Sequence, residues 1–553
     1  MLVTGVLAAQ PAELLTNARV LLFDGRGMVA SSLLIANGRI AAIDDSALAL
    51  RMGATVVDLG GATVMPAFTD HHVHLLNVGL WLLNDVEHER LFVDLSRVTS
   101  LDDVVRRLHE RARATPRGGW VLGAGWSQAS WGTQALPGAA DLDRARLDHP
   151  VFLARADGHA GWVNSAALRR AHVAIDIEGS APGRARVAKH HAGILLERAN
   201  EPLVASLPLL ADADVRSAYR MAANALAARG VTEAYDAGAL GFPGVAVLNA
   251  DFGRFLRLLR AEDAAAPLPL RVKLMIPAPS ALAESLLASS HDWRLSPRLS
   301  VTHLKLFADG ALGSRGAALT HPYADDASTR GVARMTTREI TTLALRALDA
   351  GLGVATHAIG DEAVKRALDA YDAVLVARPL VVRTRLRIEH FSYAREQDLL
   401  RAAKMGVVLS IQSNFNSAMD DDPSFGAMRV GAANEPRVYA WDRLERMGAQ
   451  MAEGSDYFAR PLEPLAGFVA ALTRRNAVGQ GRPDSIARAL VLAMQVARRA
   501  SDGTRVDPRL RVGMPADLIV LSDDPSHARV EALAKVTVLR TYSAGRLVHE
   551  SKP

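Results

Sequence analysis

The sequence predicts an α/β protein built on a (β/α)8 TIM barrel, with a small split β-sandwich domain formed by both termini and a large insertion after the first barrel strand. Three observations predict this fold. Short apolar runs alternate with helix-like segments from His72 to about residue 500, as in parallel βα units. The chain has 553 residues, well above the roughly 250 of a plain barrel. Strand-like segments with glycine turns recur at both ends of the chain.

The two terminal segments predict the split sheet domain. Residues 15–64 contain short alternating segments with an Asn37-Gly38 turn between them, and residues 516–521 and 536–548 have the same character. Asn-Gly between two such segments is typical of a hairpin turn. We therefore expect residues 1–64 and 501–553 to form one β-sandwich domain and residues 65–500 to form the barrel.

Eight apolar runs are spaced widely enough for a helix to follow each of them. The candidate barrel strands are residues 63–68, 230–235, 270–276, 300–307, 353–357, 385–389, 406–411 and 450–454. The interval between the first and second runs is too long for one crossover helix. Residues from about 80 to 210 are therefore expected to form an insertion that caps the mouth of the barrel.

A histidine pair, His72 and His74, follows the first of these runs. Side chains two residues apart on a strand point the same way, and two neutral imidazoles suit a divalent transition metal. The pair alone is weak evidence in a chain with 17 histidines. Strand alternation is expected to turn the neighbouring His71 and His303 away from the site.

Polar side chains also follow four later apolar runs. They are Lys305, His357, His390 and Asp456. The C-terminal ends of parallel strands converge on one mouth of a barrel, so these side chains and the histidine pair predict a single site. The sequence contains no cysteine, so any metal there must use nitrogen and oxygen ligands.

The order and the residue sequences of these motifs resemble those of the amidohydrolase superfamily. The resemblance is closer to amidohydrolase family 3, the YtcJ-like branch that includes N-substituted formamide deformylases. The resemblance covers nearly the whole chain. The matching segments are Gly125-Trp126-Ser127-Gln128, Asp157-Gly158-His159-Ala160, residues 305–315, His357-Ala358-Ile359-Gly360-Asp361 and Gly454-Ser455-Asp456. Two departures are Ala67, where the family usually has glycine, and residues 510–515, which replace its usual Gly-Ser-Ile-Glu-Pro-Gly phrase.

The resemblance implies a site for one or two divalent metal ions. His72 and His74 would bind the more buried ion, and His357 and His390 would bind the second. Lys305 would be carboxylated by CO2, because an ammonium has no lone pair for a metal whereas carbamate oxygens can bridge two ions. Zinc is the expected metal, with manganese, iron or cobalt as substitutes.

The implied reaction is hydrolysis by a metal-activated hydroxide. A metal-bound water with a pKa of about 7 would attack a polarised carbonyl. Asp456, which would also touch the first ion, would move the proton to the leaving nitrogen. Lys305 favours amide-type hydrolysis, since deaminase-like branches typically lack this lysine. The expected substrate is an N-substituted amide or formamide. Two alternatives stay open: hydrolysis of a lactone or other ester, and a non-catalytic binding protein that keeps the fold.

Substrate-binding candidates lie in the insertion and after Lys305. Trp126 and His159 either contact the substrate or pack the insertion. Asp309, in Ala308-Asp309-Gly310, is equally consistent with a turn, and Arg315 near the mouth could hold an anion.

The composition argues against nucleic acid and membranes as partners. The net charge is only +5 and no basic run occurs, unlike the charge pattern of a nucleic-acid-binding surface. No run reaches the ~18 apolar residues of a membrane span, and the first residues lack the positive segment of an export signal. We expect a cytoplasmic enzyme for a small-molecule substrate and, from the family, a homodimer.

Overall fold

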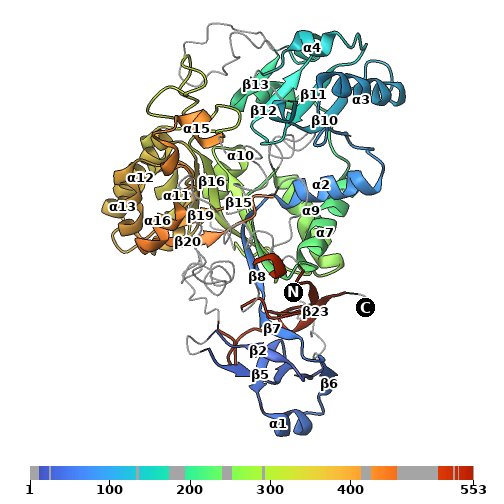
Figure 1. Ribbon diagram of the computed structural model, residues 1–553, viewed down its shortest axis with the longest axis vertical. Coiled ribbons are helices and arrows are strands. Elements are labelled where there is room, and N and C mark those ends of the chain that lie inside the picture. Colours follow the sequence, from blue (N-terminus) through green and yellow to red (C-terminus); the bar gives the residue numbers. More distant parts are fainter. Residues whose placement is uncertain are drawn as a thin grey trace.

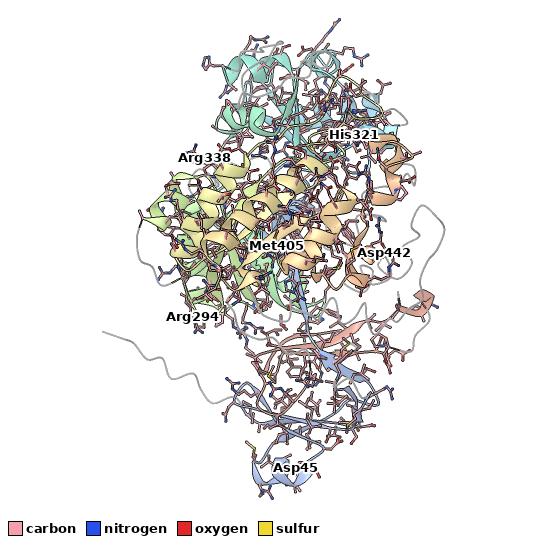
Figure 2. All side chains as sticks on the ribbon, turned by 90° about the vertical axis from the view of Figure 1, so that its left-hand side faces the viewer. Asp45, Arg294, His321, Arg338, Met405 and Asp442 are labelled. Carbon is pink, nitrogen blue, oxygen red and sulfur yellow. The ribbon has the colours of Figure 1, made fainter. Side chains whose placement is uncertain are left out.

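The computed structural model describes residues 11–23, 27–131, 136–172, 193–239, 252–288, 293–412, 425–457, 509–526, 530–533 and 535–551. Figure 1 shows three parts along the long axis: a sheet domain built from both ends of the chain, the barrel in the middle, and the insertion at the opposite end. In Figure 2, Met405 lies on the helical wall of the barrel, between Asp45 at the tip of the terminal domain and His321 towards the insertion.

The central sheet has eight parallel strands whose spatial order follows the chain. The strands are β8 (Phe68–Val73), β14 (Val231–Asp236), β15 (Arg271–Pro277), β16 (Leu299–Phe307), β17 (Gly353–Ala358), β18 (Leu386–His390), β19 (Val408–Ile411) and β20 (Gln450–Glu453). Val73 forms a parallel bridge with Tyr457, which brings the end of the series back to its beginning. The predicted eight-stranded barrel is confirmed.

The first barrel strand starts later than the sequence predicts. Residues 63–68 were expected to form it, but β7 (Thr63–Pro66) pairs with strands of the terminal domain. The chain passes from one sheet to the other at Ala67, whose N–H bonds to Asp517 O, and Phe68 N–H already bonds to Gly230 O of the barrel. The prediction was wrong because both strands are buried, and a continuous apolar run does not show where one sheet ends and the next begins.

Helices pack around the barrel between the strands. They are α2 (Leu75–Val86), α7 (Asp212–Ala227), α9 (Phe252–Ala265), α10 (Ala281–Leu287), α11 (Thr337–Asp349), α12 (Asp361–Ala377), η3 (Arg383–Arg385), α13 (Glu396–Met405), α15 (Phe425–Val430), η4 (Glu435–Arg437) and α16 (Trp441–Arg446). Thr336 begins α11 with a capping box that includes Glu339, which satisfies backbone N–H groups that the first turn leaves free. No helix in the described ranges is both long and apolar enough to cross a membrane.

Both ends of the chain build the terminal domain. One sheet has the order β23-β22-β21-β7-β2-β3 and the other β5-β4-β1-β6. The elements are β1 (Glu13–Thr16), β2 (Arg19–Leu21), β3 (Val29–Ala30), β4 (Leu33–Ala36), β5 (Arg39–Ile43), α1 (Ser46–Arg51), β6 (Thr55–Asp58), β21 (Leu518–Leu521), α19 (Val530–Leu533), β22 (Val538–Ser543) and β23 (Arg546–Glu550). An ion pair of 2.9 Å between Arg271 and Asp517 ties this domain to the barrel.

The insertion has a sheet of its own, in the order β13-β12-β11-β10-β9. Its elements are β9 (Val93–Asp94), α3 (Leu101–Ala114), β10 (Val121–Trp126), η1 (Gln128–Trp131), α4 (Ala139–Asp143), β11 (Val151–Arg155), β12 (Ala160–Val163), α5 (Ser165–Arg170), β13 (Ile194–Leu196), η2 (Glu197–Asn200) and α6 (Glu201–Val204). Trp126 and Trp162 meet in its core with ring centroids 5.4 Å apart. This separate core supports the turn at residues 157–159, between β11 and β12, which carries His159.

Candidate metal centre

The six side chains expected at the barrel mouth lie together. His72 ends β8 and His74 is the N-cap of α2, while Lys305, His357 and His390 lie at the ends of β16, β17 and β18. Asp456 follows β20. Lys305 Nζ lies 3.3 Å from His72 Nε2, and the rings of His357 and His390 are 4.5 Å apart. The convergence follows from the parallel strands, which all end at one rim.

Both early histidines use Nδ1 for a hydrogen bond and turn Nε2 towards Asp456. His72 Nδ1 lies 2.5 Å from Glu389 Oε2, and His74 Nδ1 lies 2.5 Å from Gly238 O. Because both partners are acceptors, each Nδ1 carries the proton and each Nε2 keeps a lone pair. Asp456 Oδ1 lies 3.5 Å from His72 Nε2 and 3.2 Å from His74 Nε2.

This arrangement fits a divalent metal ion. Asp456 Oδ1 is buried and accepts no hydrogen bond in the described part of the chain. It faces two Nε2 lone pairs, and the three ligand atoms lie within 4.8 Å of one another. Lone pairs that face each other repel unless a cation lies between them. Two imidazoles and a carboxylate are ligands that zinc and related ions accept.

Burial keeps the imidazoles in the neutral form that a metal needs. Burial, with the nearby charge of Lys305, lowers the pKa of His72 to about 4. Burial also lowers the pKa of His390 to about 3, and burial together with His390 places the pKa of His357 well below its ordinary value. Burial opposes ionisation of Asp456, yet the neighbouring imidazoles of His72 and His390 hold the pKa of its carboxyl below its ordinary value. The cluster therefore presents neutral nitrogens and an ionised carboxylate near pH 7.

The segment Gly454-Ser455-Asp456 closes the barrel against His72. A Cβ on Gly454 would lie 2.5 Å from His72 N, so only glycine fits there. Ser455 donates to Asp70 through its N–H at 2.9 Å and its Oγ at 2.6 Å, and Asp70 also accepts from His72 N–H at 3.1 Å. Burial raises the pKa of Asp70 to about 6, against these hydrogen bonds. Asp70 thus aligns the first and last strands, a role that sequence analysis missed because its partner is distant in the chain.

Replacing Gly454 with alanine is expected to disturb both fold and metal site. The new Cβ would overlap the backbone of His72, and overpacking of this kind costs about 1–3 kcal/mol of unfolding free energy. Thermal unfolding and metal content of Gly454→Ala would measure the effect. Gly426→Ala is the matched control, because its Cβ would meet only ordinary contacts, the nearest at 3.4 Å. Equal stability and metal content in both variants would contradict the close approach.

His357 and His390 form a second pair beside the first. His390 Nδ1 bonds to Gln412 Oε1 at 2.8 Å and lies 3.6 Å from Asp456 Oδ2. His357 Nε2 lies 3.4 Å from Gly310 O. The rings of His72 and His390 are 4.9 Å apart, so the two pairs form one continuous cluster.

The insertion brings His159 to this cluster. The rings of His159 and His357 are 5.2 Å apart. His159 follows a turn in which Asp157 accepts its N–H at 3.1 Å, and Arg155 anchors Asp157 by an ion pair of 2.5 Å. A side chain far from the barrel strands in sequence therefore reaches the mouth in a fixed position.

Three other expected substrate-binding residues are engaged with protein partners. Trp126 packs in the core of the insertion and donates Nε1–H to Leu153 O at 2.9 Å. Asp309 accepts backbone N–H groups of Ala318, Ile359 and Gly360 at 2.8–3.0 Å. Arg315 forms an ion pair of 2.8 Å with Asp325. These contacts give the three residues roles in holding the insertion and the loops at the barrel mouth.

His303 does not lie on the face of β16 opposite Lys305, where strand alternation was expected to place it. It precedes Lys305 by two residues, and strand alternation places both on the same face. His303 is buried and lies 6.1 Å from the ring of Tyr235, on which His71 also stacks at 5.1 Å. Neither histidine belongs to the cluster of candidate metal ligands in the described residues.

Comparisons with known proteins agree with this geometry. A family model described as "Amidohydrolase family" matches residues 55–549. The chain is 28% identical to "Putative amidohydrolase YtcJ" of Bacillus subtilis, over 89% of this chain and 90% of the relative, and 27% identical to "N-substituted formamide deformylase" of Arthrobacter pascens, over 97% and 98%. An uncharacterized metal-dependent hydrolase from Pyrococcus furiosus superposes with a TM-score of 0.68 at 28% identity, covering 93% of this chain and 99% of that one.

Proposed function

The chain belongs to the amidohydrolase family and is a metal-dependent hydrolase, and from that premise we propose that it cleaves a non-peptide carbon–nitrogen bond in an N-substituted amide or formamide. The observation that carries the proposal is the cluster of His72, His74 and Asp456 at the barrel mouth, in which both imidazoles are buried. The similarity to an N-substituted formamide deformylase supports this substrate class.

His72, His74 and Asp456 have separate proposed roles in this hydrolysis. A divalent cation held by His72, His74 and Asp456 would polarise a carbonyl and make a water acidic. The Asp456 carboxylate then accepts the proton of the attacking water and delivers it to the departing nitrogen as the C–N bond breaks. The products are a carboxylic acid, or formic acid from a formamide, and an amine.

Lys305 is the proposed bridge to a second ion. Burial lowers the pKa of Lys305 to about 8, which enlarges the fraction of neutral amine near neutral pH. The neutral amine adds to CO2 and loses a proton to give a carbamate, whose oxygens are suitable metal ligands. His357 and His390 would complete that second site.

Phe307 and His159 are the proposed contacts for the substrate. Phe307 follows Lys305 by two residues on the same face of β16, remains partly accessible, and lies 5.6 Å from the ring of His357. An apolar ring kept partly open beside the ligand cluster suits the organic substituent of an amide. His159 borders the cluster from the insertion and can donate a hydrogen bond to the substrate.

His159→Asn is expected to lower kcat/KM for an amide substrate roughly 10- to 100-fold, as the loss of one buried hydrogen bond would. Metal content should stay at the wild-type level, because His159 is not among the proposed ligands. Steady-state kinetics with metal analysis would measure both quantities. His149→Asn is a matched control in the insertion, since His149 bonds to Thr115 O. Unchanged kinetics of His159→Asn would remove this residue from the substrate site.

The proposed function is tested by metal analysis of the purified protein with a panel of amides, formamides and lactones. We expect at least one divalent ion per chain, activity on an amide or formamide that a chelator removes, and recovery when zinc is restored. Activity confined to lactones would replace the proposal with an esterase function. A metal-free protein with no activity on the panel would refute it.

A further inference from the structure

A buried ion pair between Arg387 and Glu389 lies beneath the ligand cluster. We infer that Glu389 is a positioning residue: its carboxylate fixes the ring of His72 with Nε2 facing Asp456, where a metal would be held, and Arg387 holds that carboxylate in place. The inference rests on the proposed metal site. It assigns a role to two residues that do not themselves face the substrate.

Both Arg387 and Glu389 also contact other residues of the barrel interior. Glu389 Oε2 lies 2.5 Å from His72 Nδ1, and its Oε1 accepts from Arg387 Nε at 2.8 Å. Arg387 also donates to His71 O at 2.8 Å, and its guanidinium lies 4.9 Å from the ring centroid of Tyr235. The side chains of Arg387 and Glu389 are 2% and 0% exposed. These contacts and this burial hold both side chains in one arrangement.

Stability alone does not account for this pair. Removing two charges from water costs several kcal/mol per ion, and apolar side chains of similar volume often stabilise a core as well. The carboxylate points at one nitrogen of one metal-ligand candidate instead of pairing only with Arg387. A carboxylate on Nδ1 fixes the ring orientation and the tautomer of a ligating histidine and makes its other nitrogen a stronger donor.

Three other histidine nitrogens in the cluster have a carbonyl or amide oxygen within 3.4 Å. His74 uses the carbonyl of Gly238, His390 uses the amide of Gln412, and His357 lies near the carbonyl of Gly310. The carboxylates near two of these histidines are farther away: Asp456 Oδ2 lies 3.6 Å from His390 Nδ1 and Asp309 Oδ1 lies 3.5 Å from His357 Nε2, whereas Glu389 Oε2 lies 2.5 Å from His72 Nδ1. His72 also has the Lys305 nitrogen 3.3 Å from its Nε2. The negative charge of Glu389 therefore acts on an imidazole that contacts Lys305, the proposed bridging residue.

The backbone at the end of β18 explains how Glu389 and His390 both serve one site. Adjacent residues of a regular strand point to opposite faces. Arg387 and Glu389 share the inward face, and His390 has φ of 74°, outside the strand region. This change of backbone direction places the His390 side chain at the barrel mouth. Glu389 therefore contacts His72, and the next residue, His390, lies beside His357 in the cluster.

The test compares zinc affinity of full-length wild type, Glu389→Gln and a matched control, using a chromophoric chelator as competitor. Loss of an outer partner of this kind typically weakens metal affinity about 10- to 100-fold, and we expect that change for Glu389→Gln. Glu233→Gln is the control, because Glu233 pairs with Arg271 at 2.9 Å on another barrel strand and touches no histidine of the cluster. We expect wild-type zinc affinity for Glu233→Gln.

A spectroscopic readout separates positioning from general stability. With cobalt in place of zinc, the visible absorption spectrum should change in Glu389→Gln and not in Glu233→Gln. In wild type, 15N spectra of labelled histidine, assigned with His72→Gln, should show the proton of His72 on Nδ1. This measurement keeps the inference testable should Glu389→Gln fail to fold.

The outcomes distinguish the inference from the proposed function. Wild type that binds no divalent metal overturns both. Wild type that binds zinc, with equal affinity and an unchanged cobalt spectrum in Glu389→Gln, overturns the role of Glu389 and leaves the proposed function standing. A His72 proton on Nε2 likewise overturns the role of Glu389.

Discussion

Asp456→Asn is expected to lower kcat/KM for an amide or formamide by about 10²- to 10⁴-fold, the range that loss of a general acid–base group produces. Asparagine has almost the same shape, but its amide cannot accept a proton near neutral pH. Its oxygen can still face His72 and His74, so the fold should persist. Steady-state kinetics, metal content and thermal unfolding of the same preparations would separate a chemical defect from a structural one.

Asp398→Asn is the control for Asp456→Asn. Asp398 is also buried and pairs with Arg395 at 2.6 Å, but it lies on α13, outside the barrel. We expect Asp398→Asn to change stability without changing kcat/KM in the folded fraction. Wild-type activity in Asp456→Asn would exclude the proton transfer proposed for this carboxylate.

Lys305→Ala is expected to lower kcat/KM on the order of 10²-fold or more, because a bridged second ion contributes several kcal/mol of transition-state stabilisation. The variant should also bind fewer metal ions than wild type. Supplying 13C-bicarbonate to wild type should produce a carbamate carbon signal in the NMR spectrum. That signal should be absent from Lys305→Ala and present in Lys365→Ala, which removes a helix lysine paired with Asp369.

Two results would contradict the role of Lys305. A wild-type protein without any carbamate signal, yet fully active, would show that the lysine acts unmodified. Lys305→Ala with wild-type metal content and activity would remove the residue from the site altogether. The first result would still allow a site with one metal ion at His72, His74 and Asp456.

The sequence alone predicts much of the barrel and its mouth because both follow from local patterns. Short apolar runs mark strands, and the polar residue that ends each run must lie at one rim. His72, Lys305 and His390 are found in this way without knowledge of any contact. The family resemblance then supplies their proposed roles.

What the sequence does not predict depends on contacts between distant segments. Glu389 is visible as a charged residue in a strand, but nothing local shows that it supports His72. Asp309 and Arg315 are candidate substrate residues from the sequence, which does not show that Asp309 accepts backbone N–H groups or that Arg315 pairs with Asp325. The junction at Ala67 is hidden because both neighbouring strands are equally apolar.

The closure between Asp70 and Ser455 has a consequence for biosynthesis. These residues are 385 positions apart. During synthesis, β8 therefore cannot contact the segment after β20 until almost the whole barrel has been translated. A nascent chain carries His72 and His74 from an early stage but gains the Asp456 carboxylate only near the end. Metal that binds only the closed barrel stabilises it by mass action. Complete assembly of this site therefore requires synthesis of the chain at least through Asp456.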